Sequence, residues 1–224
     1  MSYRPFMAIA IVLLLAAGAF AQQFSADMIN TRKDSSAEHQ GKLYVGDHKI
    51  RFEGDRSSQG ESGGMGGGAF IIDEATQTTT ILVPERKIYI QSSAGDQQPG
   101  FQALTALMRP ADPNNACPQW EAAMAASHHE KKLTSCRKIG TDTVNGRTAV
   151  KYEGVNSDGE KGNVWVDPKL HFFLKLDGKD GGAELRNIKE GTQPASLFEI
   201  PSDYTKFDMG SMMRNRRGAQ KPPQ

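Results

Sequence analysis

The chain has 224 residues with 27 basic and 26 acidic side chains, so its formal net charge at pH 7 is only +1. This length suits one domain, because β-barrel domains often reach such a size undivided. The charge balance lacks the basic patch or stripe of a nucleic-acid-binding domain. We therefore expect no nucleic-acid partner.

The N-terminus predicts export. Residues 1–21 combine an apolar run over 7–17, too short for a comfortable membrane span, with the small residues Ala19 and Ala21 of a cleavage site. The mature chain should then start at Gln22, with an uncleaved anchor as the alternative. No Cys follows the run, so we expect a soluble periplasmic protein without a lipid anchor or transmembrane segment; secretion is possible.

Alternating apolar and polar residues predict six strands in the first half of the chain. The first spans 24–32, and a hairpin follows over 41–45 and 48–54. After a glycine-rich connection at 60–68, the stretch 69–90 alternates as three short strands with two tight turns. This pattern is typical of an antiparallel sheet with one apolar face.

The glycine-rich connection contains Gly60-Glu61-Ser62-Gly63-Gly64, which matches the Gly-x-Ser-x-Gly pattern of serine hydrolases. A nucleophile elbow needs a strand before the serine and a helix after it, but here more glycines and then a strand follow. We interpret the segment as a linker and expect no catalytic residues; a serine hydrolase remains a distant alternative.

Residues 97–133 change character and predict two helices. The first spans 102–108 and stops at Pro110, with Leu104 and Leu107 on one apolar stripe. The second spans 118–132, since a proline suits the first turn of a helix. The stripe is explained either by core packing or by a lid whose apolar face meets a ligand.

Cys117 and Cys136 are the only cysteines of the chain. An even count in an exported protein predicts one disulfide, which contributes roughly 3 kcal/mol in the chain-entropy model. The alternative is a metal site that includes His128 and His129, but the usual Cys-x-x-Cys spacing is absent. We expect a disulfide, no metal and no cofactor.

The second half predicts five more strands. They span 137–143, 147–154, 162–167, 171–177 and 183–189, and Asn-Gly between the first two is a strong hairpin signal. No strand–helix–strand alternation occurs, which disfavours a parallel sheet. A segment over 194–204 is expected to close the end of the sheet. We place the domain at 22–207 and a disordered basic tail at 208–224.

A series of short motifs runs in one order over most of the mature chain, and it resembles the LolA/LolB-like family of periplasmic lipoprotein carriers and outer-membrane acceptors. The resemblance implies a mainly β (α+β) fold: a curved, antiparallel, incomplete barrel of about eleven strands with two helices inserted midway on its concave face. It also implies an apolar cavity for acyl chains between sheet and helices. The motifs are Gly41-Lys42-Leu43-Tyr44-Val45, His48-Lys49-Ile50-Arg51-Phe52-Glu53, Phe70-Ile71-Ile72-Asp73 with Thr76, Pro84 with Lys87-Ile88-Tyr89, Val164-Trp165-Val166-Asp167-Pro168, and Leu197-Phe198-Glu199-Ile200-Pro201 with Tyr204.

The chain departs from the family at one turn. In the carrier, the turn after the first hairpin strand bears an Arg that holds the helical lid closed. Here that turn is Gly46-Asp47-His48. The resemblance therefore does not extend to the carrier's gating.

The resulting hypothesis is a non-enzymatic, monomeric binding protein for lipid or lipidated cargo, such as an acyl chain or a lipoprotein, as in outer-membrane lipoprotein sorting. Pure apolar burial fits acyl chains, which offer area and no hydrogen-bond partners. The residues expected to line its cavity are Ile50, Phe52, Phe70, Ile72, Ile81, Val83, Ile88, Ile90, Phe101, Leu104, Leu107, Met108, Val164, Val166, Leu174 and Leu176.

A second hypothesis is a structural or interaction domain of the envelope that contacts another envelope protein. In that case the helices pack tightly on the sheet and leave no room for a ligand. An acyl-sized cavity separates the two hypotheses.

Overall fold

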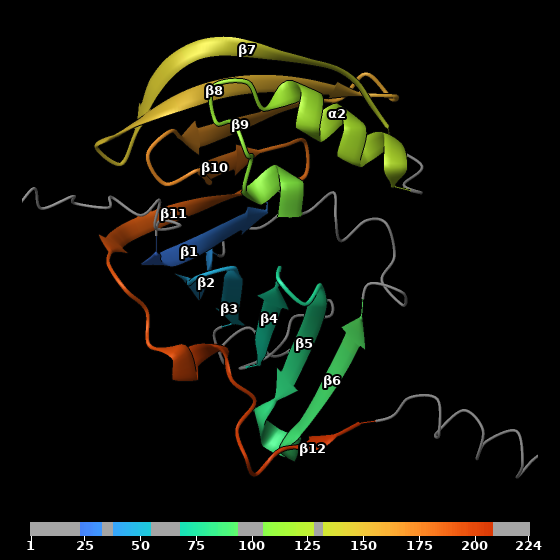
Figure 1. Ribbon diagram of the computed structural model, residues 1–224. Coiled ribbons are helices and arrows are strands. Elements are labelled where there is room, and N and C mark those ends of the chain that lie inside the picture. Colours follow the sequence, from blue (N-terminus) through green and yellow to red (C-terminus); the bar gives the residue numbers. More distant parts are fainter. Residues whose placement is uncertain (1–22, 33–37, 55–67, 94–104, 128–131, 208–224) are drawn as a thin grey trace, which may run out of the picture.

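The computed structural model describes residues 23–32, 38–54, 68–93, 105–127 and 132–207 (Figure 1). Their strands form one 12-stranded sheet, with two helical segments between β6 and β7. The strands are β1 (Phe24–Arg32), β2 (Glu38–Val45), β3 (Lys49–Gly54), β4 (Ala69–Asp73), β5 (Thr78–Val83), β6 (Ile88–Ser93), β7 (Leu133–Val144), β8 (Arg147–Asn156), β9 (Lys161–Asp167), β10 (Phe172–Asp177), β11 (Gly181–Glu190) and β12 (Thr205–Lys206).

The strand order is β12-β6-β5-β4-β3-β2-β1-β11-β10-β9-β8-β7. Each half of the chain forms a meander, and pairing of β1 with β11 joins the two halves. The described pairs are antiparallel except β12 with β6, which is parallel. The mainly β fold expected from the sequence is confirmed, with one short strand more than expected.

The turns explain why the hairpins close where they do. Asn145 and Gly146 both have positive φ, 49° and 77°, as the Asn-Gly signal predicts for a tight hairpin. Gln77 and Lys87 also take the left-handed conformation, with φ of 52° and 48°, at the ends of the two turns that bound β5. Strand alternation and turn chemistry thus agree along the chain.

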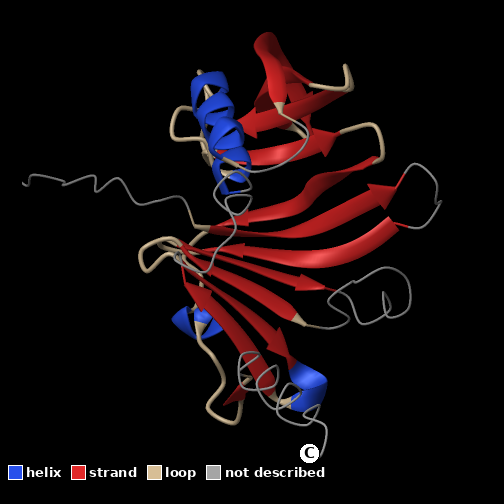
Figure 2. Cartoon of the chain, turned by 90° about the vertical axis from the view of Figure 1, so that its right-hand side faces the viewer, coloured by secondary structure: helices blue, strands red, loops and turns tan. Residues whose placement is uncertain are grey.

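The helical insertion lies over one end of the sheet (Figure 2). Residues 105–108 are helical, and α2 (Cys117–Ala126) follows, with Pro118 in its first turn as predicted. The prediction that this helix extends to residue 132 is wrong. Ser127 is already extended, and its hydroxyl donates to the carbonyl of Met124 at 2.8 Å. This local bond competes with helix continuation, and β7 begins at Leu133.

The main core lies on the concave face. Cross-strand pairs such as Ile50 with Ile72 and Leu43 with Phe52 place apolar side chains side by side on this face. Met108, at the end of the first helical segment, is 3% exposed and packs into the same cluster. The first helical segment is thereby anchored to the main core.

The convex face of β4 and β5 carries a second apolar cluster that alternation alone did not predict. Ile71 and Leu82 are buried there beneath Phe198, which belongs to the 3₁₀ helix η3 (Ala195–Phe198). Arg51 fixes this segment, because its Nη1 donates to the carbonyl of Leu197 at 2.7 Å. Residues 194–204 therefore cover the outside of the sheet, and β12 then pairs with β6 at its edge.

Candidate ligand-binding cavity

A cavity of about 470 Å³ lies between α2 and the concave side of β7–β11. Its floor is formed by strands of the second meander and its roof by the helical insertion. A polar rim comes from the loops after β8 and β10. The lining residues are Leu107, Trp120, Met124, Leu133, Cys136, Tyr152, Gly154, Asn156, Glu160, Lys161, Gly162, Asn163, Val164, Leu176, Asp177, Gly178, Lys179, Asp180, Gly181, Gly182 and Ala183.

Glycines create part of this space. Strand register pairs Gly154 on β8 with Gly162 on β9. Two residues along each strand, Tyr152 pairs with Val164, so the glycine pair lies on the same concave face beside this apolar pair. Gly178, directly after β10, and Gly181, the first residue of β11, extend the row, and the amide of Gly178 donates to the carbonyl of Gly181 at 2.9 Å. The floor therefore lacks side chains in a row that crosses four neighbouring strands.

A β-carbon at Gly162 would meet only the carbonyl oxygen of Asp177, at 3.4 Å, which is an ordinary contact. Gly162 also lacks the positive φ that other glycines of the chain show. The backbone would thus accept a larger residue there. Glycine at this position costs sheet stability and contributes open space.

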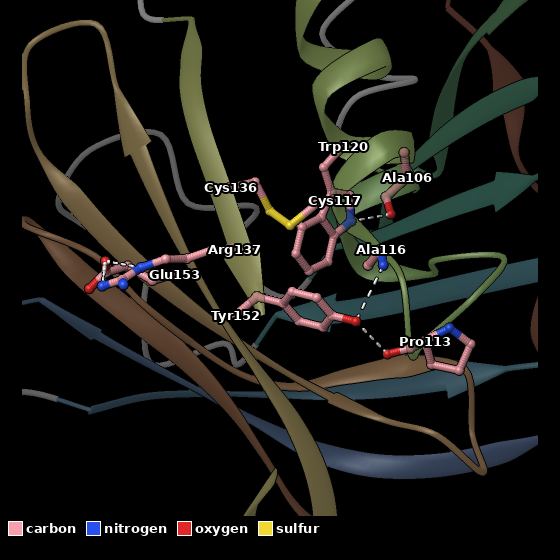
Figure 3. The surroundings of a disulfide bond; sticks show 9 residues. All are labelled: Ala106, Pro113, Ala116, Cys117, Trp120, Cys136, Arg137, Tyr152 and Glu153. Atoms are coloured by element: carbon pink, nitrogen blue, oxygen red, sulfur yellow. Dashed lines mark hydrogen bonds and ion pairs between the residues drawn. A yellow bond between two sulfur atoms is a disulfide. The ribbon is translucent and has the colours of Figure 1, made fainter. Parts of the chain in front are cut away.

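Trp120 and Tyr152 hold the roof to the floor (Figure 3). Their rings meet edge to face at 5.0 Å between centroids. The Tyr152 hydroxyl donates to the carbonyl of Pro113 at 2.9 Å and accepts from the amide of Ala116 at 3.3 Å. Burial raises the pKa of Tyr152, so its phenol stays protonated at neutral pH. The Trp120 indole N–H donates to the carbonyl of Ala106 at 2.9 Å and links the two helical segments.

The disulfide joins the same roof to the edge of the sheet (Figure 3). Cys117, the first residue of α2, is bonded to Cys136 of β7, with their Cα atoms 5.5 Å apart. The predicted pairing is present, so neither sulfur is free to hold a metal; His128 and His129 lie outside the described residues. Cys136 also lines the cavity.

The rim at the loop end of the cavity carries both signs of charge. The Nζ of Lys179 pairs with Glu160 at 2.6 Å, and the side-chain amide of Asn156 donates to the same carboxylate at 2.9 Å. Lys161 lies 3.8 Å from Glu153 of β8. Asn156, Glu160, Lys161 and Lys179 thus place polar groups at one end of a cavity whose other walls include Leu107, Val164 and Leu176.

The residues predicted to line the cavity fall into four groups. Leu107, Val164 and Leu176 border it. Others are buried in side-chain packing, namely Ile50, Ile72, Met108, Val166 and Leu174. A further group is half-buried on β3–β6, beyond the helical roof: Phe52, Phe70, Ile81, Val83, Ile88 and Ile90. Phe101 and Leu104 lie outside the described residues.

Sequence reasoning missed several parts of this site. Trp120, Met124 and Tyr152 were not predicted to line the cavity. The glycines of the floor were assigned to strand ends and loops. Glycines at matching positions of neighbouring strands were the available signal, but they can be recognised only when the strand register is known.

The β4–β5 turn carries two acidic side chains, Asp73 and Glu74. Asp73 accepts from the amide of Thr76 at 2.9 Å and pairs with Lys49 at 3.1 Å. Glu74 pairs at 2.8 Å with Arg109, which follows the first helical segment. Both carboxylates therefore have partners, and the second pair attaches the helical insertion to the β4–β5 turn.

No group of three or more His, Cys, Asp or Glu side chains within the described ranges is arranged to hold a metal ion. No described helix has both the length and the apolar character to cross a membrane. Ser62 and its glycine-rich segment lie outside the described residues.

Comparison with known proteins shows similarity to solved structures only. No family model and no curated protein sequence matches the chain. An uncharacterised conserved protein from Thermus thermophilus has a TM-score of 0.51 at 11% identity, over 84% of this chain and 90% of that one. The MucA/MucB complex from Pseudomonas aeruginosa has a TM-score of 0.48 at 12% identity, over 81% of this chain and 56% of the matched chain. A domain assigned to outer membrane lipoprotein sorting, from Vibrio parahaemolyticus, has a TM-score of 0.33 at 13% identity, over 81% of this chain and 91% of that one.

At these sequence identities the similarity shows the fold alone. It rests on the Thermus thermophilus protein, whose TM-score is 0.51. The curved sheet with helices inserted between β6 and β7 is the architecture that the sequence motifs implied. The chain thus shares its overall fold with the uncharacterised Thermus thermophilus protein.

Proposed function

We propose that the protein is an exported, non-enzymatic binding protein that holds an acyl chain of a lipid or a lipidated protein in the cavity under α2. The cavity itself carries the proposal. Its volume of about 470 Å³ falls within the range of about 300–1,000 Å³ typical of ligand sites. Its floor and roof are apolar, and its polar groups lie on the rim.

The energetics favour an acyl chain. Each buried methylene contributes about 0.8 kcal/mol, so ten or more can offset the cost of ordering a flexible ligand. The walls contributed by Leu107, Val164 and Leu176 offer area and no hydrogen-bond partner. The disulfide supports export, because such bonds persist in oxidising compartments.

Filling the cavity tests this proposal. We expect wild-type protein to bind dansyl-undecanoic acid with a Kd on the order of 1 μM, and Gly162→Val to weaken binding at least about tenfold because the valine occupies the floor. The variant should keep or slightly raise the free energy of unfolding, since valine favours strands and glycine does not. Probe fluorescence titration and urea unfolding measure the two effects.

Thr148→Val is the matched control. Thr148 is exposed on β8, near the β7–β8 turn and outside the cavity lining, so this valine should leave the Kd unchanged. If wild-type protein shows no saturable binding, or if both valine variants bind equally well, the proposal fails. The envelope interaction domain then becomes the working hypothesis.

A further inference from the structure

The roof helix is fixed mainly at one end. At its N-terminal turn, Cys117 is crosslinked to β7, Trp120 is 4% exposed, and the preceding Ala116 is bonded to the Tyr152 hydroxyl. Beyond Trp120, Glu121, Ala122, Ala125 and Ala126 are exposed, Met124 is half-buried, and Ser127, which ends the helix, is buried. The crosslink, the ring contact and the hydrogen bonds that attach α2 thus all involve residues 116–120.

The disulfide also lies beside the cavity, so breaking it would affect a bound ligand. Cys136 borders the cavity, and Cys117 begins the helix that supplies Trp120 and Met124 to the lining. Both cysteines are half-buried. Removing the crosslink leaves the ring contact and the indole hydrogen bond, which hold the helix without a covalent bond.

We propose that the Cys117–Cys136 disulfide sets how long the cavity retains its ligand. In the oxidised protein the crosslink keeps α2 on the sheet and the ligand leaves slowly. In the reduced protein α2 separates from the sheet more often, and each separation opens the cavity. This inference rests on the proposed function and adds redox control to it.

The chemistry requires a dithiol as reductant. One of its sulfurs, as thiolate, attacks a cysteine sulfur, which forms a mixed disulfide and releases the other cysteine as a thiolate. The second dithiol sulfur then displaces the remaining cysteine. The dithiol is oxidised to a disulfide by loss of two electrons, and its two protons account for the two cysteine thiols formed.

The experiment measures dissociation of dansyl-undecanoic acid by chasing with excess unlabelled fatty acid. We expect the dissociation rate to rise at least about tenfold in wild-type protein treated with dithiothreitol and in the Cys117→Ser/Cys136→Ser variant. Removing dithiothreitol and reoxidising the wild type should restore the slow rate. Equal rates in the oxidised and reduced proteins overturn the inference while leaving the proposed function intact.

A loss of global stability must be separated from local opening. Leu82→Ala weakens the convex cluster, far from the roof, and should leave the dissociation rate near that of wild type. Acceleration of dissociation by Leu82→Ala as large as that by reduction overturns the inference.

If the serine variant does not fold, hydrogen exchange of the reduced wild-type protein decides. Faster exchange confined to residues 105–127 supports the inference, and faster exchange throughout the sheet overturns it. Failure of oxidised wild type to bind the probe at all defeats the proposed function and the inference together.

Discussion

Tyr152 shows how one polar atom can fix a cavity wall. Its side chain is 1% exposed, yet its hydroxyl satisfies both the amide of Ala116 and the carbonyl of Pro113, which precede α2. Buried polar groups of this kind are costly when a partner is removed. The residue thus couples the floor of the cavity to the loop that starts the roof.

Replacing Tyr152 by Phe should therefore lower the free energy of unfolding by about 1–3 kcal/mol, because the amide and the carbonyl lose their partner in a buried place. Urea unfolding followed by circular dichroism measures the change. Tyr89→Phe on β6 is the comparison, since that residue is only half-buried. Equal stability of Tyr152→Phe and wild type would show that the hydroxyl does not support the wall.

At the scale of elements, the segment over 194–204 acts as a cover for the convex face. Phe198 is 9% exposed, and a β-carbon on Gly46 would lie 2.7 Å from its ring. Gly46 lacks a positive φ, so its backbone would accept alanine. The glycine is needed because the ring packs directly against the β2–β3 turn.

Gly46→Ala should consequently destabilise the protein by about 1–3 kcal/mol, the usual cost of overpacking. Phe198→Leu in the same chain should recover part of the loss, because the shorter side chain relieves the clash. A double-mutant cycle by urea unfolding measures this coupling. Strictly additive effects would contradict the packing of Phe198 on the turn.

The elements also show what sequence could and could not predict. Period-two alternation and the Asn145-Gly146 turn located most strands, because both signals are local. The end of α2 was missed because Ser127 terminates it within an otherwise helix-compatible stretch. The convex cluster was missed because covering Ile71 and Leu82 depends on a segment more than a hundred residues away.

The cavity was harder still to predict. The apolar residues of β3–β6 and those of β9–β10 look alike in sequence, but the roof lies over only one end of the sheet. The glycine row appears only once Gly154 and Gly162 are in register. Sequence therefore predicted the apolar face, whereas the chain's three-dimensional arrangement determines where that face is left open.

For the whole molecule, the two tryptophans differ in position relative to the cavity: Val164 lines it, and Trp165, the next residue of β9, points to the opposite face of the sheet. Trp120 borders the cavity. Trp165 lies on the other face, with Lys151 and Lys175 4.7 Å and 5.2 Å from its ring centroid and its N–H donating to Asp142 at 2.8 Å. A quencher carried by an acyl chain in the cavity should therefore distinguish them.

The most direct test is quenching of tryptophan fluorescence by a fatty acid brominated along its chain. If the ligand lies under α2, the Trp165→Phe variant, which retains Trp120, shows saturable quenching. The Trp120→Phe variant, which retains Trp165, then shows little quenching at the same concentrations. Equal quenching of both residues, or none of Trp120, would contradict an acyl-binding cavity between the helical roof and the sheet.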